Sequence, residues 1–259
     1  MASRSIAKAD RLTPRAVIRI AGMAGALIVC IIPHGLWRMV RAHSPWPPRF
    51  LGLCARAAGV RVAIAGEPIR HNVLFTSNHL SWLEILALGG AGRTAFVAKA
   101  EVGRWGIIGW LAGLNHTVYV EREDRKAVKG QANALRDALL RRKPVTLFPE
   151  GTTGDGVALL PFRASLFAAV APPPEGVRVQ PIALDYGDFA AEIAWTDAEP
   201  ADANVKRILN RKGTIRLTIH FLEPLPHDVL SDRKAIALMA QSQIASRLDA
   251  ASRERRLGL

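Results

Sequence analysis

The sequence predicts an α/β fold, a layered mixed sheet flanked by helices, with an N-terminal membrane-associated helical segment. The first observation is that short apolar runs rich in β-branched residues alternate with segments of helical periodicity from residue 60 onward. The second is a basic and apolar stretch over residues 1–50. The third is a length of 259 residues with 49% hydrophobic residues, which is enough to bury a full core.

Seven apolar runs are predicted as strands because they are short, contain β-branched residues and are separated by turn or helical segments. In chain order, they are residues 60–65, 72–76, 94–98, 117–120, 145–148, 177–184 and 214–221. Their alternation with helices, without any internal repeat, favours one layered domain. Chemistry is then expected in the loops at the ends of the strands.

The intervening segments are predicted as helices where apolar residues recur at helical spacing. An amphipathic helix is expected over residues 126–142, with Leu135, Leu139 and Leu140 facing inward. An apolar helical pattern also follows the second strand, and residues 161–170 look helical.

The predicted organisation has three parts. Three prolines are expected to end the N-terminal segment, because prolines at that density do not sustain a helix; they are Pro45, Pro47 and Pro48. A final helix is predicted from Arg233, capped by Ser231, and it continues into a basic tail. The predicted units are a membrane-associated segment (1–50), an α/β domain (51–230) and a C-terminal basic helix (231–259).

The formal charge of +13 points to an anionic surface or substrate, and it leaves membrane and nucleic acid as rival partners. The N-terminal cations bracket the uncharged run 20–32, which is shorter than the roughly 20 residues needed to cross a bilayer. We interpret it as a membrane-dipping or interfacial hairpin, or a marginal span. A signal peptide and a buried core helix are the alternatives. The two separated cysteines, Cys30 and Cys54, favour a reducing compartment without a disulfide scaffold or a cysteine zinc site.

The heptapeptide 78–84, Asn-His-Leu-Ser-Trp-Leu-Glu, carries the first chemical signal. A neutral imidazole at His79 can accept a hydroxyl proton, and a carboxylate at Glu84 can fix its tautomer. Five residues apart, the two side chains meet only if His79 lies in a turn and Glu84 in the first turn of the following helix. Ser81 to Glu84 is a capping-box pattern that supports this placement. The alternative is that Glu84 merely caps the helix.

A second signal is the loop that follows the strand 145–148. Residues 149–156 contain three glycines and two threonines, which expose backbone N–H groups and hydroxyls suited to an anionic headgroup. The loop lacks the Lys-Ser/Thr ending of a nucleotide-binding loop, so ATP binding is not expected. A tight structural turn is the alternative.

Asn78-His79, separated from an acid by four residues, and Phe148-Pro149-Glu150-Gly151-Thr152 together resemble the glycerolipid acyltransferase family. Two further blocks, 115–122 and 179–184, resemble this family's second and fourth motifs, and Phe96-Val97-Ala98-Lys99 resembles its phosphate-side lysine. The resemblance covers residues 74–184.

This resemblance implies roles for individual residues. His79 is the implied general base and Glu84 its partner, while the implied substrate-binding residues are Lys99, Arg122, Glu150, Gly151, Thr152 and Thr153. The family usually has Asp where this chain has Glu84. Phosphatidate-forming members usually have Arg-Ser where this chain has Thr153-Gly154, and this version is similar to the branch that acylates lyso-ornithine lipid.

The resemblance therefore implies a lysolipid O-acyltransferase that uses an acyl thioester of acyl carrier protein or coenzyme A. The acceptor is 1-acylglycerol-3-phosphate or lyso-ornithine lipid, and neither a metal nor a bound cofactor is expected. The expected location is the cytoplasmic face of the inner membrane, with membrane lipids rather than nucleic acid as partners. The alternative is a catalytically weak lipid-binding protein of the same fold. For the cluster Trp105 to Leu111, an acyl groove, a lipid contact and ordinary core remain open.

Overall fold

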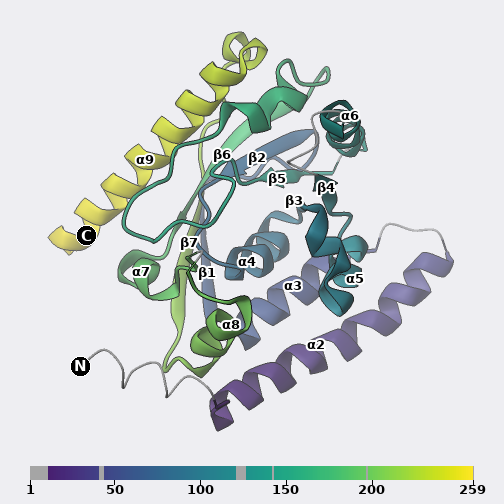
Figure 1. Cartoon of the computed structure of the whole chain (residues 1–259), viewed down its shortest axis with the longest axis vertical. Helices are drawn as coiled ribbons and strands as arrows, with labels where there is room; N and C mark the ends of the chain where they lie inside the picture. Colours follow the sequence, from purple (N-terminus) through teal and green to yellow (C-terminus); the bar gives the residue numbers. More distant parts are fainter. Residues whose placement is uncertain (1–10, 41–43, 121–126, 142, 197, 259) are drawn as a thin grey trace.

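The computed structural model describes residues 11–40, 44–120, 127–141, 143–196 and 198–258. Within these residues, seven strands form one mixed sheet in the order β1-β7-β6-β2-β5-β3-β4 (Figure 1). The strands are β1 (Val60–Ala65), β2 (Val73–Ser77), β3 (Ala95–Lys99), β4 (Val118–Val120), β5 (Val145–Leu147), β6 (Arg178–Asp185) and β7 (Ile215–Phe221). All neighbouring pairs are parallel except β6 and β7, which are antiparallel. The predicted mixed α/β sheet is confirmed.

Helices cover both faces of the sheet (Figure 1). The α-helices are α2 (Pro14–Met39), α3 (Trp46–Ala57), α4 (Leu83–Gly92), α5 (Gly106–Leu114), α6 (Ala127–Leu140), α7 (Ala190–Ile193), α8 (Ala201–Asn210) and α9 (Arg233–Leu257). The 3₁₀ segments are η1 (Ala100–Arg104), η2 (Ala164–Val170), η3 (Gly187–Phe189) and η4 (His227–Ser231). Helices α3 and α4 lie on one face, with α2 outside α3, while α9 and α6 lie on the other (Figure 1).

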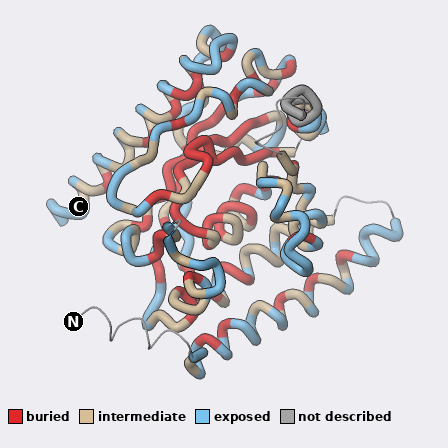
Figure 2. Tube along the Cα trace, viewed as in Figure 1, coloured by how far each residue is buried: buried red, intermediate tan, exposed pale blue. Residues whose placement is uncertain are grey.

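Two apolar cores result from the alternation of side chains along the central strands. In β2, Val73 and Phe75 belong to the core beneath α3 and α4, whereas Leu74 belongs to the core beneath α6 and α9. The central strands are buried on both sides, as the tube colouring of Figure 2 shows. Such two-sided burial explains why these strands read as continuous apolar runs in the sequence.

Helix α2 is longer than the predicted apolar run and forms one continuous helix instead of a hairpin. Arg19 fixes it to the domain, because its guanidinium donates to the carbonyl oxygens of Ile208, Leu209 and Gly213 at 3.1, 3.1 and 2.8 Å. Thr13 caps α2 and also hydrogen-bonds to Asn210. Most of the helix is exposed (Figure 2), so the buried-core alternative is wrong for this segment.

Two details of the predicted helices are wrong, and the prolines that were expected to end the N-terminal segment lie at the start of a helix. Helix α3 begins at Trp46, because prolines are tolerated in a first turn, where no N–H is needed for the helical ladder. The N-cap of α9 is Asp232, whose carboxylate accepts from Lys234 N–H at 2.8 Å, and not Ser231. Leu140 is exposed at the end of α6 although Leu135 and Leu139 are buried.

Candidate functional site

The candidate site lies at the carboxyl ends of β2 and β5. These two strands are paired in parallel, so the loops that follow them leave the same edge of the sheet. The loop after β2 carries His79, and the loop after β5 carries Glu150. Asn78 ties the first loop to β6, because its side chain donates to Leu184 O and accepts from Leu184 N–H, at 3.0 and 2.8 Å.

The side chains of His79 and Glu84 meet as the sequence predicts. Glu84 Oε2 lies 2.5 Å from His79 Nδ1. Since a carboxylate is a hydrogen-bond acceptor, Nδ1 carries the proton and Nε2 keeps its lone pair. The imidazole is 19% exposed while the carboxylate is completely buried. The partly exposed imidazole therefore has Nε2 available as a base, while the Glu84 carboxylate that orients it is buried.

Glu84 orients the histidine and also holds the turn that precedes helix α4. Its Oε1 accepts the backbone N–H groups of Leu80 and Ser81 at 2.8 and 3.0 Å, while Oε2 contacts His79. The helix begins at Leu83, which places Glu84 in the first turn, where a carboxylate is favourable. The capping-box prediction is therefore wrong in detail, because the N-cap of α4 is Trp82 without a side-chain hydrogen bond, and Glu84 binds the backbone of the turn before it.

Glu150 is turned inward toward the loop that carries His79. It is 2% exposed, and its Oε1 accepts the backbone N–H of His79 at 2.9 Å. Burial, together with the charge of Glu84, raises the pKa of Glu150 to about 8, against the opposing effect of the backbone N–H groups that it accepts. Below this pH the folded protein holds Glu150 as a neutral acid. Contact between Glu150 and an acceptor headgroup stays a prediction.

The imidazole of His79 is also held by an aromatic ring. It stacks on Phe148 with ring centroids 4.1 Å apart and planes 17° apart, and Phe148 lies in turn against Phe96. Gly154 N–H donates to His79 O at 2.7 Å, which joins the two loops directly. The histidine is therefore fixed by its side chain, its N–H and its carbonyl group.

The conformation of the loop after β5 requires glycine at two of its positions. Gly151 and Gly156 have φ values of +80° and +78°, which favour glycine, and a Cβ at Gly156 would lie 2.5 Å from the Ala190 backbone. Thr153 does not stand free, because its hydroxyl donates to the carbonyl oxygen of Trp195. The alternative of a tight structural turn therefore explains Gly151 and Gly156. Headgroup binding by Gly151, Thr152 and Thr153 stays a prediction.

Of the other two predicted binding residues, the structure describes only Lys99. Lys99 is the exposed last residue of β3. Arg122 falls outside the described residues, so its predicted contact with the headgroup stays a prediction. In the described ranges, no group of three His, Cys, Asp or Glu side chains is placed to hold a metal ion.

Sequence reasoning missed Tyr186, which directly follows β6. Its ring is fully buried, and the pKa of its hydroxyl is raised well above 10 by burial and by the neighbouring Glu84 carboxylate. The hydroxyl has no hydrogen bond of ordinary geometry. Tyr186 therefore places a buried, uncharged phenol ring next to Glu84. The signal that could have found it is its position two residues after the fourth motif-like block.

Taken together, the arrangement is that of a histidine base oriented by a buried carboxylate, at the edge of a mixed α/β sheet, and it suits proton removal from a hydroxyl. A family model described as "Acyltransferase" matches residues 61–185, the range that holds His79, Glu84 and Glu150. The chain belongs to this acyltransferase family, and it is an enzyme of the lysolipid acyltransferase class.

Individual relatives narrow the comparison. The chain is 30% identical over 250 residues to a lyso-ornithine lipid O-acyltransferase of Rhodobacter capsulatus, a match that covers 92% of this chain and 88% of the relative. It is 32% identical to the enzyme of that name from Brucella abortus, covering 92% and 96%. A 1-acyl-sn-glycerol-3-phosphate acyltransferase of Neisseria gonorrhoeae is 33% identical over a shorter range, 59% of this chain and 58% of the relative.

A solved structure supports the fold. The crystal structure of the 1-acyl-sn-glycerophosphate acyltransferase PlsC from Thermotoga maritima superposes with a TM-score of 0.61 at 17% identity. The match covers 79% of this chain and 78% of that one. At this identity the likeness concerns the fold.

Proposed function

We propose that this enzyme transfers a fatty acyl group from a carrier thioester to the hydroxyl of lyso-ornithine lipid. The observation that carries acyl transfer is the 2.5 Å contact between His79 and Glu84 at the sheet edge. The same contact argues against a catalytically weak lipid-binding protein, because that alternative requires Glu84 to fail to reach His79.

In the proposed reaction, His79 Nε2 accepts the acceptor's hydroxyl proton as the oxygen attacks the thioester carbonyl carbon. The new C–O bond forms and the C–S bond breaks as the tetrahedral intermediate collapses. The imidazolium then returns its proton to the departing thiolate, so His79 ends the cycle neutral. Glu84 stabilises the imidazolium between these steps. The donor is the thioester of acyl carrier protein or of coenzyme A.

The choice of acceptor rests on Thr153 and on the relatives. Where phosphate-binding members carry a cation, this chain has a threonine whose hydroxyl is engaged with Trp195 O. An amino-acid headgroup makes less demand on a cation at that position than a phosphate does. The relatives matched over most of their length are named for lyso-ornithine lipid, whereas the relative from Neisseria gonorrhoeae named for 1-acylglycerol-3-phosphate is matched over 58% of its length.

The proposed location is the cytoplasmic face of the inner membrane. Helix α2 is, among the described residues, the one helix long and apolar enough to cross a bilayer. Its Arg19 anchor holds it along the domain, so we place it in the headgroup region parallel to the membrane instead of across it. Both cysteines are free, in keeping with the reducing side.

The test is an acceptor panel with purified protein. Labelled acyl carrier protein or coenzyme A thioesters are offered with lyso-ornithine lipid, 1-acylglycerol-3-phosphate or glycerol-3-phosphate in matched micelles. The expected result is kcat/KM at least tenfold higher for lyso-ornithine lipid. Preference for 1-acylglycerol-3-phosphate would overturn the acceptor assignment while leaving acyl transfer intact, and transfer to none of them would overturn the function.

A further inference from the structure

Helix α5 displays large apolar side chains to solvent. We define the α5 face as Trp105, Ile107, Ile108 and Trp110, which are 46%, 61%, 53% and 49% exposed. Ordinary core is therefore wrong for these residues of the Trp105 to Leu111 cluster. Four large apolar residues gathered within six positions form an exposed patch of the kind that marks an interaction surface.

The rotation of α5 is fixed by the close packing of Gly109, so this exposure is built into the packing. Gly109 is the buried residue of the helix, and a Cβ there would lie 2.3 Å from the carbonyl oxygen of Gly103. Tyr119 donates its hydroxyl to Gly109 O at 3.1 Å. The side without a side chain faces the protein, and the tryptophans and isoleucines consequently face outward.

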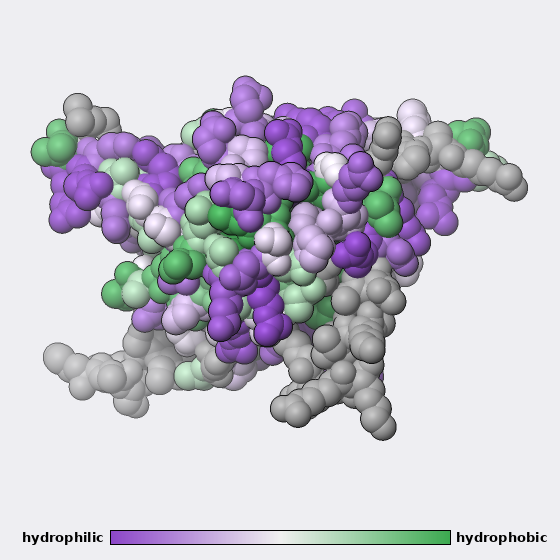
Figure 3. All heavy atoms as spheres, turned by 90° about the horizontal axis from the view of Figure 1, so that it is seen from above, coloured by the Kyte–Doolittle hydropathy of each residue, from purple (hydrophilic) through white to green (hydrophobic). Residues whose placement is uncertain are grey.

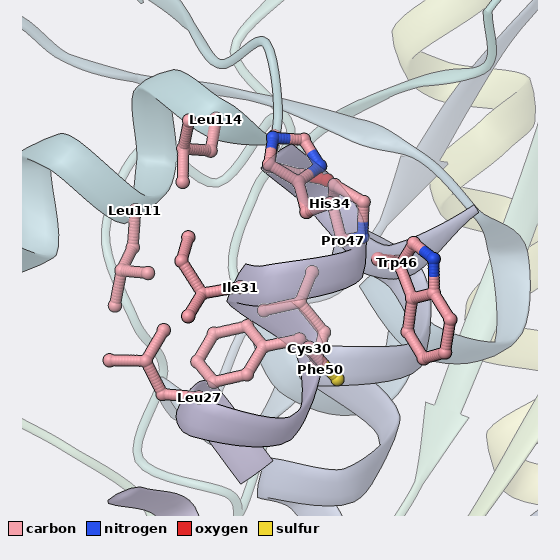
Figure 4. Close-up of a pocket in the computed structure, with 11 residues that line it drawn as sticks. Leu27, Cys30, Ile31, His34, Trp46, Pro47, Phe50, Leu111 and Leu114 are labelled. Carbon is pink, nitrogen blue, oxygen red and sulfur yellow. The ribbon is translucent and has the colours of Figure 1, made fainter. Parts of the chain in front are cut away.

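Helix α5 contacts the outer helix α2 through residues that follow the α5 face. Leu111 and Leu114 of α5 line the same apolar pocket as Leu27 and Ile31 of α2, and Figure 4 shows these side chains pointing toward one another. Around this contact, α2 also exposes large apolar residues, Ile28, Val29 and Ile32. The two helices thus offer neighbouring apolar surfaces at one side of the molecule (Figure 1).

The charges around the α5 face indicate which partner this apolar surface binds. Residues 11–66, which include α2 and α3, contain arginines but neither Asp nor Glu. Next to the α5 face, the exposed ionic groups are Lys99 at the end of β3 and Glu101 and Arg104 of η1, which sum to one positive charge. The side opposite α2 is mostly hydrophilic (Figure 3). Exposed tryptophan rings flanked by cations are typical of the headgroup region of an anionic bilayer.

We propose that the α5 face inserts into an anionic lipid leaflet as a second contact beside α2. This inference rests on the proposed transfer to a membrane lipid, and it adds a specific orientation. A single amphipathic helix leaves a domain free to roll about the helix axis. A second inserted segment removes that freedom and fixes how the sheet edge with His79 meets the leaflet.

The test places an environment-sensitive fluorophore on α5. Ile108→Cys gives one exposed thiol, since Cys30 and Cys54 are buried and burial raises the pKa of the Cys54 thiol to about 12. Leu238→Cys, at an exposed apolar position on α9, is the matched control. Each labelled protein is mixed with phosphatidylglycerol–phosphatidylcholine vesicles, with and without a quencher attached to the lipid tails.

We expect the fluorescence at position 108 to rise several-fold with vesicles and to be quenched by the tail-bound quencher, while position 238 stays unchanged. If the protein floats with vesicles but position 108 stays unchanged, α5 does not insert. A rise at position 108 on concentrating the protein without lipid would show self-association and would also overturn the proposal. Transfer to a short-chain lysolipid dissolved as monomers, measured in parallel, separates failure of this contact from failure of the enzyme.

Discussion

The Glu84 carboxylate divides its two oxygens between the imidazole of His79 and the backbone of the turn that carries this histidine. Oε2 lies 2.5 Å from His79 Nδ1, and Oε1 accepts the N–H groups of Leu80 and Ser81. The longer side chain of glutamate, in a position where related enzymes usually have aspartate, therefore suits this turn. The geometry of His79 depends on both contacts together.

Shortening or neutralising Glu84 is expected to lower activity. Glu84→Asp moves the carboxylate back by one methylene, so it loses one of its two sets of contacts, and we expect kcat/KM to fall about tenfold, as for loss of a charged hydrogen bond. Glu84→Gln removes the charge that stabilises the imidazolium, and we expect a loss of roughly 10²-fold or more. Steady-state kinetics on folded variants measures both. A large rise for Glu84→Asp would instead favour the catalytically weak alternative.

Glu150 is expected to make the protein less stable as pH rises from the ordinary carboxyl pKa to about 8. Its pKa is raised to about 8 in the folded protein, so between the ordinary carboxyl pKa and 8 only the unfolded chain loses the proton. The stabilisation by the neutral acid is therefore present at low pH and lost as pH rises through about 8. Glu150→Gln keeps an oxygen for His79 N–H but does not titrate.

Urea unfolding of wild type and Glu150→Gln at pH 6 and pH 9 measures this effect. We expect the variant's free energy of unfolding relative to wild type to increase by on the order of 2 kcal/mol between the two pH values. An equal difference at both pH values would mean that Glu150 is already ionised in the folded protein at pH 6.

Arg19 is expected to anchor α2. Arg19→Met keeps much of the apolar stem but leaves the carbonyl groups of Ile208, Leu209 and Gly213 without their donor. We expect a loss of about 1–3 kcal/mol and faster proteolysis within α2. Arg15→Met is the control, because Arg15 is exposed and makes one long hydrogen bond, 3.5 Å to Asn210 O. Equal effects of the two substitutions would contradict the anchoring role.

The sheet was predictable because its central strands are buried on both faces and its other strands still read as short runs rich in β-branched residues. β1 has the predicted bounds, and the six other strands differ by one residue at one or both ends. Helix α2 was underestimated because Arg19 looked like a flanking charge, and only tertiary structure supplies the carbonyl groups that satisfy it. Helix α8 was not predicted at all, because its apolar residues are interspersed with Asp, Asn, Lys and Arg.

The candidate site also contains contacts that were predictable from the sequence and contacts that were not. The approach of His79 to Glu84 follows from local geometry, in which a turn leads into a helix, and it was predictable from spacing. The hydrogen bond from His79 N–H to Glu150 depends on the parallel pairing of β2 and β5, which no local pattern encodes. The same is true of Tyr186, which reaches Glu84 from the end of β6.

The most direct test compares wild type with His79→Ala in a single assay of acyl transfer. Both proteins are incubated with a labelled acyl thioester and lyso-ornithine lipid, and the acylated lipid and the released thiol are quantified together. We predict one thiol per lipid ester for wild type and a rate 10²- to 10⁴-fold lower for the variant, with unfolding and vesicle binding unchanged. An unchanged transfer rate in His79→Ala would contradict the account.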